Sequence, residues 1–169
     1  MQNELEFEVK KTDAEILIRW FRNHHRDLPW RNTRDPYAIW ISEIMLQQTR
    51  VDAVRDRFIE FIHALPTIYF LADVSDDRLM KLWEGMGYYS RARNLKKCAL
   101  KIIKDYNASI PSDPKILQTL PGIGPYTAGA IASQAFGIPV PAVDGNVLRV
   151  LSRFAGCHED IRQPAVKTM

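Results

Sequence analysis

The chain has 169 residues, a length that suits one well-buried domain or one domain with part of a second. Hydrophobic residues make up 46% and charged residues 25%, as in ordinary globular proteins, and no apolar run approaches the roughly 20 residues of a membrane span. The N-terminus carries acidic residues where a signal peptide is positively charged, so secretion is not expected. We expect a cytoplasmic, nucleoid-associated protein if the source is bacterial, or a nuclear protein if it is eukaryotic. Cys98 and Cys157 lie far apart and outside any Cys-x-x-Cys motif, which favours free thiols over a metal site.

Basic residues gather in two stretches, although the net charge is only +3. One stretch runs from Arg19 to Arg34. The other runs from Arg91 to Lys104 and contains no acidic residue before Asp105. Clustered cations suit a polyanion such as nucleic acid. A solvated helix surface is the alternative, and charge alone favours it.

Capping residues, prolines and apolar spacing predict helices along nearly the whole chain. Apolar residues recur at helical spacing from Val51 to Leu65, and Pro66 ends that run. No alternating apolar pattern or Asn-Gly turn indicates a strand, so we predict an all-α fold. The predicted helix starts are Thr12 with Glu15 as a capping box, Asp35 before Pro36, Ser75, Ser90, and Asp113 before Pro114.

A glycine hairpin lies between two predicted helices. A short helix from Asp113 to Leu120 enters the sequence Pro-Gly-Ile-Gly, and Pro125 opens the next helix. Amide groups gathered at a helix N-terminus attract phosphate oxygens without recognising the base sequence. The segment resembles the hairpin of the helix-hairpin-helix DNA-binding motif, which implies that Gly122, Gly124 and Thr127 contact DNA. An ordinary helical hairpin is the alternative.

Two carboxylates stand in settings that suggest chemistry. Glu43 lies in the middle of a predicted apolar helix, and burial disfavours the charged form of a carboxyl group, so Glu43 can hold a proton and deliver it. The alternative is a partly exposed charge paired with Arg50 or a lysine. Asp144 follows the loop Gly-Ile-Pro-Val-Pro-Ala-Val and precedes a predicted helix, where an N-cap is the common role of aspartate. Hairpin, small-residue helix, Gly/Pro-rich loop and aspartate nevertheless follow the order that defines the helix-hairpin-helix glycosylase superfamily.

From about Ile16 to Phe154 the sequence resembles the MutY-type adenine DNA glycosylases, most clearly in Ser-Glu-Ile-Met-Leu-Gln-Gln-Thr and Gly-Met-Gly-Tyr-Tyr-Ser-Arg-Ala-Arg-Asn-Leu. The resemblance implies removal of adenine mispaired with 8-oxoguanine or guanine in double-stranded DNA. It implies that Glu43 protonates the adenine ring, that Asp144 stabilises the cationic sugar and that Tyr126 assists. It also implies a base pocket lined by Trp30, Arg31 and Leu46, and DNA contacts from Gln48, Met86 and Tyr88.

The resemblance further implies a fold in two helical parts. We expect residues 28–136 to form a six-helix barrel containing the helix-hairpin-helix. Residues 1–27 would be a helix of the second subdomain, and residues 137–169 would hold the Gly/Pro-rich loop, Asp144 and the start of that subdomain. MutY-type enzymes hold a [4Fe–4S] cluster on four cysteines after the aspartate. We therefore expect no cofactor within this chain, and we expect the chain to be a fragment whose cluster lies in the missing part of the family fold. We also expect a monomer that contacts no membrane.

Three other interpretations remain. Endonuclease III-like glycosylase/AP lyases use a lysine after the hairpin as a Schiff-base nucleophile. Tyr126 occupies that place, and residues 125–144 contain no lysine, which favours a monofunctional enzyme. The second alternative is an inactive helix-hairpin-helix fragment that only binds DNA, and the third is a helical scaffold without a nucleic acid partner. The presence of both Glu43 and Asp144 argues against the second, since a binding module needs neither carboxylate.

Overall fold

The computed structural model describes residues 11–158 and 160. The all-α prediction is confirmed, because these residues form helices and loops and contain no strand. No helix within them is long and apolar enough to cross a membrane. The helices are α1 (Lys11–His24), the 3₁₀ helix η1 (Pro29–Arg31), α2 (Pro36–Leu46), α3 (Val51–Ala64), α4 (Ile68–Asp73), α5 (Asp76–Leu82), α6 (Ser90–Tyr106), α7 (Pro114–Leu117), α8 (Pro125–Phe136) and α9 (Gly145–Phe154).

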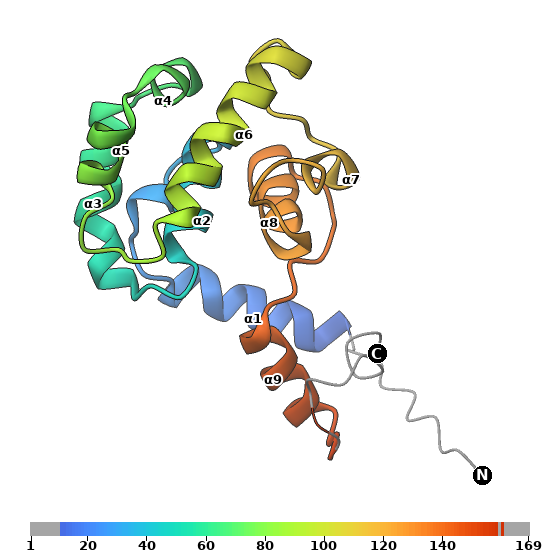
Figure 1. Ribbon diagram of the computed structural model, residues 1–169. Helices are drawn as coiled ribbons and strands as arrows, with labels where there is room; N and C mark the ends of the chain where they lie inside the picture. The colour runs from blue at the N-terminus through green and yellow to red at the C-terminus, as the bar shows by residue number, and fades with distance from the viewer. Residues whose placement is uncertain (1–10, 159, 161–169) are drawn as a thin grey trace. The chain divides into compact units, whose positions relative to one another are not determined.

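The chain divides into two compact units. One unit spans residues 28–142, and the other combines residues 1–27 with residues 143–169. The first unit holds η1 and the helices from α2 to α8, and the described part of the second holds α1 and α9. Within the first unit, α3, α4 and α5 lie on one side of α6, and α7 and α8 lie on the other (Figure 1). The domain limits and roles expected from the sequence stay predictions.

Three of the predicted helix starts are confirmed as side-chain caps. The side chain of Asp35 accepts a hydrogen bond from the amide of Tyr37 at 3.0 Å, and Asp113 caps α7 in the same way through Lys115 at 2.7 Å. The Ser75 hydroxyl accepts from the amide of Arg78 at 3.3 Å and starts α5. Each cap satisfies a backbone donor that the first helical turn leaves without an intrahelical partner.

Two other predicted starts are wrong in position. Thr12 lies inside α1, which already includes Lys11. Ser90 is the first residue of α6 rather than its cap, because the helical hydrogen bonds begin earlier, with the amide of Arg91 donating to the carbonyl of Tyr88 at 2.9 Å. The short elements η1 and α4 were not predicted, since three and six residues are too few to show a helical apolar period.

Helix α2 is the centre of the core of residues 28–142. Every residue from Tyr37 to Met45 is buried, as expected of a helix that is apolar on all sides. Three large aromatic side chains are fully or almost fully buried, namely Trp40, Phe61 and Trp83, and the rings of Phe61 and Trp83 meet edge to face at 6.0 Å. The packed core therefore holds the backbone of α2, and with it the side chains on this helix, in place.

Candidate active site

Glu43 lies on the buried helix α2. It is 6% exposed, and its Oε1 accepts a hydrogen bond of 2.9 Å from Nε2 of Gln134 on α8. The alternative of a partly exposed helix charge is therefore wrong. Gln134 was not predicted. The sequence offered one sign of it, because Gln134 is an amide side chain near the end of a predicted helix made mostly of small and apolar residues.

A second polar contact joins the same two helices one turn further along. Nε2 of Gln47, the C-cap residue of α2, donates to the hydroxyl of Thr127 at 3.4 Å. Tyr126 is half-buried and precedes Thr127 in the first turn of α8. Thr127 itself is buried, and its expected contact with DNA stays a prediction. Glu43 and Tyr126 thus belong to two helices joined by two polar contacts, both toward the C-terminal end of α2.

Gly129 lets the Gly/Pro-rich loop pass directly over α8. A Cβ atom at this position would lie 2.3 Å from the carbonyl oxygen of Pro141 and 3.3 Å from Cα of Ala142. Both neighbours are backbone atoms, so they cannot move aside as a side chain would. Glycine is consequently the residue that fits where the loop leading toward Asp144 crosses this helix. The small residues of α8 were noted in the sequence, but this role of Gly129 was not predicted.

Asp144 belongs to the second unit and is the N-cap of α9. Its carboxylate accepts hydrogen bonds from the amides of Asn146 at 3.0 Å and Val147 at 2.8 Å, and from Nδ2 of Asn146 at 2.9 Å. Partial burial acts to raise the pKa of Asp144, but the hydrogen bonds from Val147 and Asn146 and from its own amide outweigh it and lower the pKa below its ordinary value. The carboxylate is therefore held ionised. The interpretation of Asp144 as an N-cap is correct. Its carboxylate keeps a negative charge that can stabilise a positive charge nearby.

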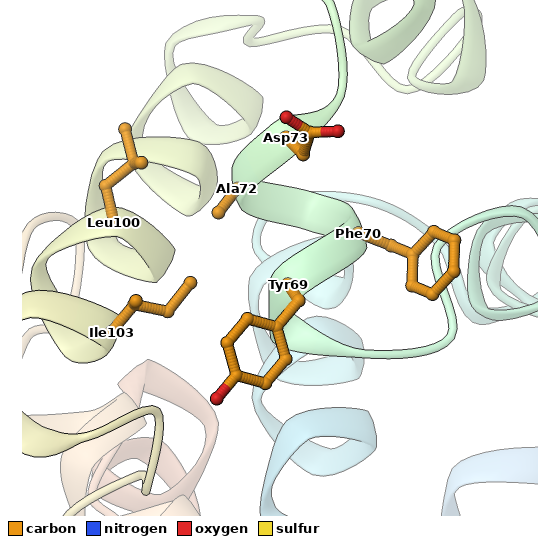
Figure 2. A pocket seen from close by; sticks show the side chains of 6 residues that line it. All are labelled: Tyr69, Phe70, Ala72, Asp73, Leu100 and Ile103. Atoms are coloured by element: carbon orange, nitrogen blue, oxygen red, sulfur yellow. The ribbon is translucent and has the colours of Figure 1, made fainter.

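The three residues expected to line a base pocket lie in different environments. Trp30 is buried in the core and meets Phe58 edge to face at 5.3 Å. Leu46 is half-buried against the same core, whereas Arg31 is exposed at the end of η1. A groove of about 460 Å³ between α4 and α6 contains none of the predicted site residues (Figure 2). The pocket roles of these residues stay predictions.

Two exposed residues expected to contact DNA occupy strained positions in loops. Gln48 has φ of 56° and Tyr88 has φ of 44°, in the left-handed region that side chains rarely adopt. Such strain costs of order 1 kcal/mol or more, and it persists where the surrounding structure enforces it, often at functional sites. Met86 differs from both, because its side chain is 5% exposed and belongs to the core. The expected contact of Met86 with DNA stays a prediction.

The hairpin glycines have different structural roles. Gly122 has φ of +79°, and a Cβ atom there would lie 2.9 Å from Cβ of Asn94 on α6. Gly124 is the N-cap of α8 with an ordinary φ of −90°, and a Cβ atom there would meet nothing within 4 Å. Pro125 follows it at the first helical position, as predicted. Gly122 is thus required by the fold, whereas the space at Gly124 is open to a ligand.

This difference gives a testable prediction. Gly122→Ala should lower the melting temperature, because φ of +79° and the Asn94 contact both oppose a side chain. Gly124→Ala should leave the melting temperature within a few degrees of the parent but weaken DNA binding, about equally for all duplexes, since hairpin amides contact phosphates and not bases. Thermal melts and fluorescence anisotropy with two unrelated duplexes check both statements. A loss of binding by Gly124→Ala confined to one base pair would contradict the phosphate role.

The basic stretch that begins at Arg91 is only partly a free surface. Arg91 is 9% exposed, so its assignment to a surface cluster is wrong. Nζ of Lys96 lies 2.6 Å from a carboxylate oxygen of Asp76, and Nζ of Lys101 lies 2.7 Å from Asp105. Pairing with acidic neighbours reduces the field available to a polyanion. The hairpin and the strained loops are therefore better candidates for DNA contact than the middle of α6.

The cysteines do not fit a four-thiolate iron–sulfur cluster. The chain has two of them, and burial raises the pKa of Cys98 to about 12, which disfavours the thiolate that binds iron. Among the residues that the structure describes, no group of three or more His, Cys, Asp or Glu side chains could hold a metal ion. The [4Fe–4S] cluster that the resemblance implies stays a prediction.

A comparison with protein families matches residues 41–168 to the HhH-GPD superfamily base excision DNA repair proteins. The chain belongs to this family. The match includes Glu43, the hairpin, the Gly/Pro-rich loop and Asp144, in the order that the sequence analysis noted. The structural features described above are therefore those of a family that repairs DNA by base excision.

Relatives and solved structures agree with this assignment. The chain is 45% identical over 146 residues to the adenine DNA glycosylase of Mus musculus, covering 81% of this chain and 28% of that protein. It is 40% identical over 151 residues to the adenine DNA glycosylase of Mycobacterium tuberculosis, covering 89% of this chain and 50% of that protein. A thermostable thymine-DNA glycosylase matches with a TM-score of 0.84 and 31% identity, over 92% of this chain and 74% of the other.

The expected resemblance to adenine DNA glycosylases is thus confirmed, and so is the expected glycosylase fold. The chain spans between about a quarter and a half of the length of these curated relatives.

Proposed function

We propose that the protein is a monofunctional adenine DNA glycosylase that hydrolyses the N-glycosidic bond of adenine mispaired with 8-oxoguanine or guanine in double-stranded DNA. The observation that carries the proposal is the 40–45% identity to proteins named adenine DNA glycosylase from a mammal and a bacterium. The buried carboxyl group of Glu43, within a matched family of base excision proteins, supports it independently.

The proposed chemistry needs an acid and an anion. Adenine is a poor leaving group until a ring nitrogen is protonated, so Glu43 gives its proton to the ring as the glycosidic bond breaks and the bonding electron pair leaves with the base. The sugar then carries an oxocarbenium-like positive charge, which the carboxylate of Asp144 stabilises. Water adds its oxygen to the sugar carbon, and the proton that water loses restores Glu43. Tyr126 assists in this chemistry.

Several observations support DNA engagement by the first unit. Gly124 leaves open space at the N-terminus of α8, whose first amides suit a phosphate. Gln48 and Tyr88 are exposed in strained loops. An extrahelical adenine must leave the base stack at a cost of a few kcal/mol, and side chains inserted in the duplex can offset that cost. We therefore propose phosphate contacts from the hairpin and contacts to the disturbed duplex from the two loops.

The endonuclease III-like alternative requires an amine where this chain has a phenol. Tyr126 cannot form the imine on which a lyase depends, and residues 125–144 contain no lysine. The protein should therefore leave an intact strand that carries an abasic site.

A strand-scission assay tests the proposal. The protein is incubated with a labelled duplex containing one adenine opposite 8-oxoguanine, and half of each sample is treated with alkali. Scission of the adenine strand is expected only after alkali. An otherwise identical duplex with adenine opposite thymine should stay intact. Strand scission without alkali would favour the lyase, and an intact strand in every sample would refute adenine excision.

A further inference from the structure

The guanidinium group of Arg91, at the start of α6, donates hydrogen bonds to two loops. Nη1 donates hydrogen bonds to carbonyl oxygens at the end of α2, and Nη2 donates to the loop between α5 and α6 and to a hydroxyl after α2. The acceptors of Nη1 are the carbonyls of Ile44 at 2.9 Å, Met45 at 3.1 Å and Gln47 at 2.5 Å. The acceptors of Nη2 are the carbonyls of Met86 at 2.8 Å and Gly87 at 3.3 Å and the hydroxyl of Thr49 at 3.2 Å.

The buried charge of Arg91 is stabilised by dipoles and aromatic faces. A cation at the C-terminus of a helix is favourable because the last carbonyl groups carry partial negative charge. Three of the acceptors, the carbonyls of Ile44, Met45 and Gln47, are such groups at the C-terminal end of α2. The guanidinium carbon also lies 5.4 Å from the centre of the Trp83 ring and 5.6 Å from that of Tyr88. Arg91 thus contacts α2, the residues after it, and both ends of the loop before α6.

The two loops joined in this way carry the strained, exposed residues. Gln48 stands between two acceptors of Arg91, namely the carbonyl of Gln47 and the hydroxyl of Thr49. Tyr88 follows the acceptor carbonyl of Gly87, is 62% exposed, and has its ring beside the guanidinium. A left-handed backbone at a residue other than glycine persists only where its surroundings enforce it, and Arg91 supplies hydrogen bonds on the chain beside both residues.

We infer that Arg91 is a positioning residue that fixes the loop of residues 47–50 and the loop of residues 84–89 as one rigid surface, so that Gln48 and Tyr88 engage the mispaired duplex together. This inference rests on the proposed function. Arginine suits the task because its planar group holds two Nη atoms, each with two N–H donors, in a fixed fork, so one residue can serve acceptors in two loops while its Nε has no hydrogen-bond partner among the described residues. Lysine keeps the charge but has three donors on one freely rotating nitrogen, and it cannot hold both loops in the same geometry.

The test compares Arg91→Lys with Arg78→Lys, the same chemical change at an exposed arginine of α5. The quantity measured is the mispair preference, defined as the ratio of Kd for an undamaged duplex to Kd for an A:8-oxoguanine duplex. Arg91→Lys should lower this preference roughly tenfold, within the range of couplings between residues of one hydrogen-bond network, and Arg78→Lys should leave it unchanged. An unchanged preference in Arg91→Lys would overturn the inference.

A double-mutant cycle separates positioning from a general loss of structure. In a protein that already carries Gln48→Ala and Tyr88→Ala, adding Arg91→Lys should change the preference less than about twofold, because the side chains it positions are gone. A full tenfold effect in that background would contradict the inference. Thr49→Val is a milder second variant that removes one acceptor of Nη2, and it should lower the preference in the parent but not in the double variant.

Hydrogen exchange tests the inference even if the parent protein shows no adenine excision and no mispair preference, which would refute the proposed function alone. Arg91→Lys should speed amide exchange in both residues 47–50 and residues 84–89, while exchange in α8 stays as in the parent. Faster exchange in one loop only, or equally throughout the unit, would overturn the inference, because Arg91 would then not join the two loops.

Discussion

Glu43→Gln should lower the single-turnover rate of adenine excision by about 10²–10⁴-fold, the usual contribution of a positioned general acid. The substitution removes the ionisable proton and little else. The amide oxygen that it introduces can still accept the hydrogen bond that Gln134 donates to Glu43 at 2.9 Å. Because the shape and this contact are kept, we expect the melting temperature and the affinity for DNA to stay close to those of the parent.

The matched control is Glu60→Gln, the same change on the exposed face of α3, where Glu60 pairs with Arg57 at 3.0 Å. An exposed pair of this kind contributes little to stability, so this variant should excise adenine at the parental rate. Excision by a quench-and-alkali time course, together with circular dichroism and anisotropy, gives all three quantities. Near-normal excision by Glu43→Gln would remove Glu43 from the proposed chemistry.

Asp144→Asn should lower adenine excision by at least about 10²-fold while leaving α9 capped. Asparagine is about as good an N-cap as aspartate, so the hydrogen bonds to Asn146 and Val147 can persist. What is lost is the negative charge, and removing one electrostatic contact to a developing charge typically costs about 10²–10³-fold in rate. Asp144→Ala should lose both the charge and the cap, with an added cost to stability of about 0.5–2 kcal/mol.

The expected pH dependence of adenine excision by the parent and by Asp144→Asn follows from the lowered pKa of Asp144. A carboxyl group whose pKa is lower in the folded than in the unfolded state stabilises the fold above its ordinary pKa, and this stabilisation is lost as the pH falls through the folded value. Asp144 should therefore be ionised at every pH from 5 to 8, so the parent and Asp144→Asn should differ by the same factor across that range. Asp35→Asn, a change at the cap of α2, is the control and should keep excision. A ratio that shrinks toward pH 5 would refute an ionised Asp144.

Local sequence determined the elements whose cause is local. A carboxylate followed by proline starts a helix because the carboxylate accepts from the first free amides and proline fits the first helical position, and so Asp35 and Asp113 cap helices as predicted. The mostly apolar character of residues 37–46, interrupted by Ser42 and Glu43, implied that α2 is buried, and with it Glu43. The order of hairpin, loop and aspartate likewise lies in the sequence itself, which is why the family could be expected before any contact was known.

The tertiary structure decided the features that depend on residues far apart in the chain. The hydrogen bond between Gln134 and Glu43 spans 91 positions, and no periodicity reports it. In the sequence Arg91 is one more cation of a basic helix, yet four acceptors that lie 42 to 47 positions away converge on its guanidinium group. Together with the nearby carbonyls of Met86 and Gly87 they hold it inside the fold, because a guanidinium group is buried only where enough oxygens surround it. In the sequence Gly129 is one of several small residues in its helix, and only the folded structure brings the backbone of Pro141 against it. Sequence patterns report propensity and burial, whereas the convergence of donors, acceptors and backbones is a property of the packed chain.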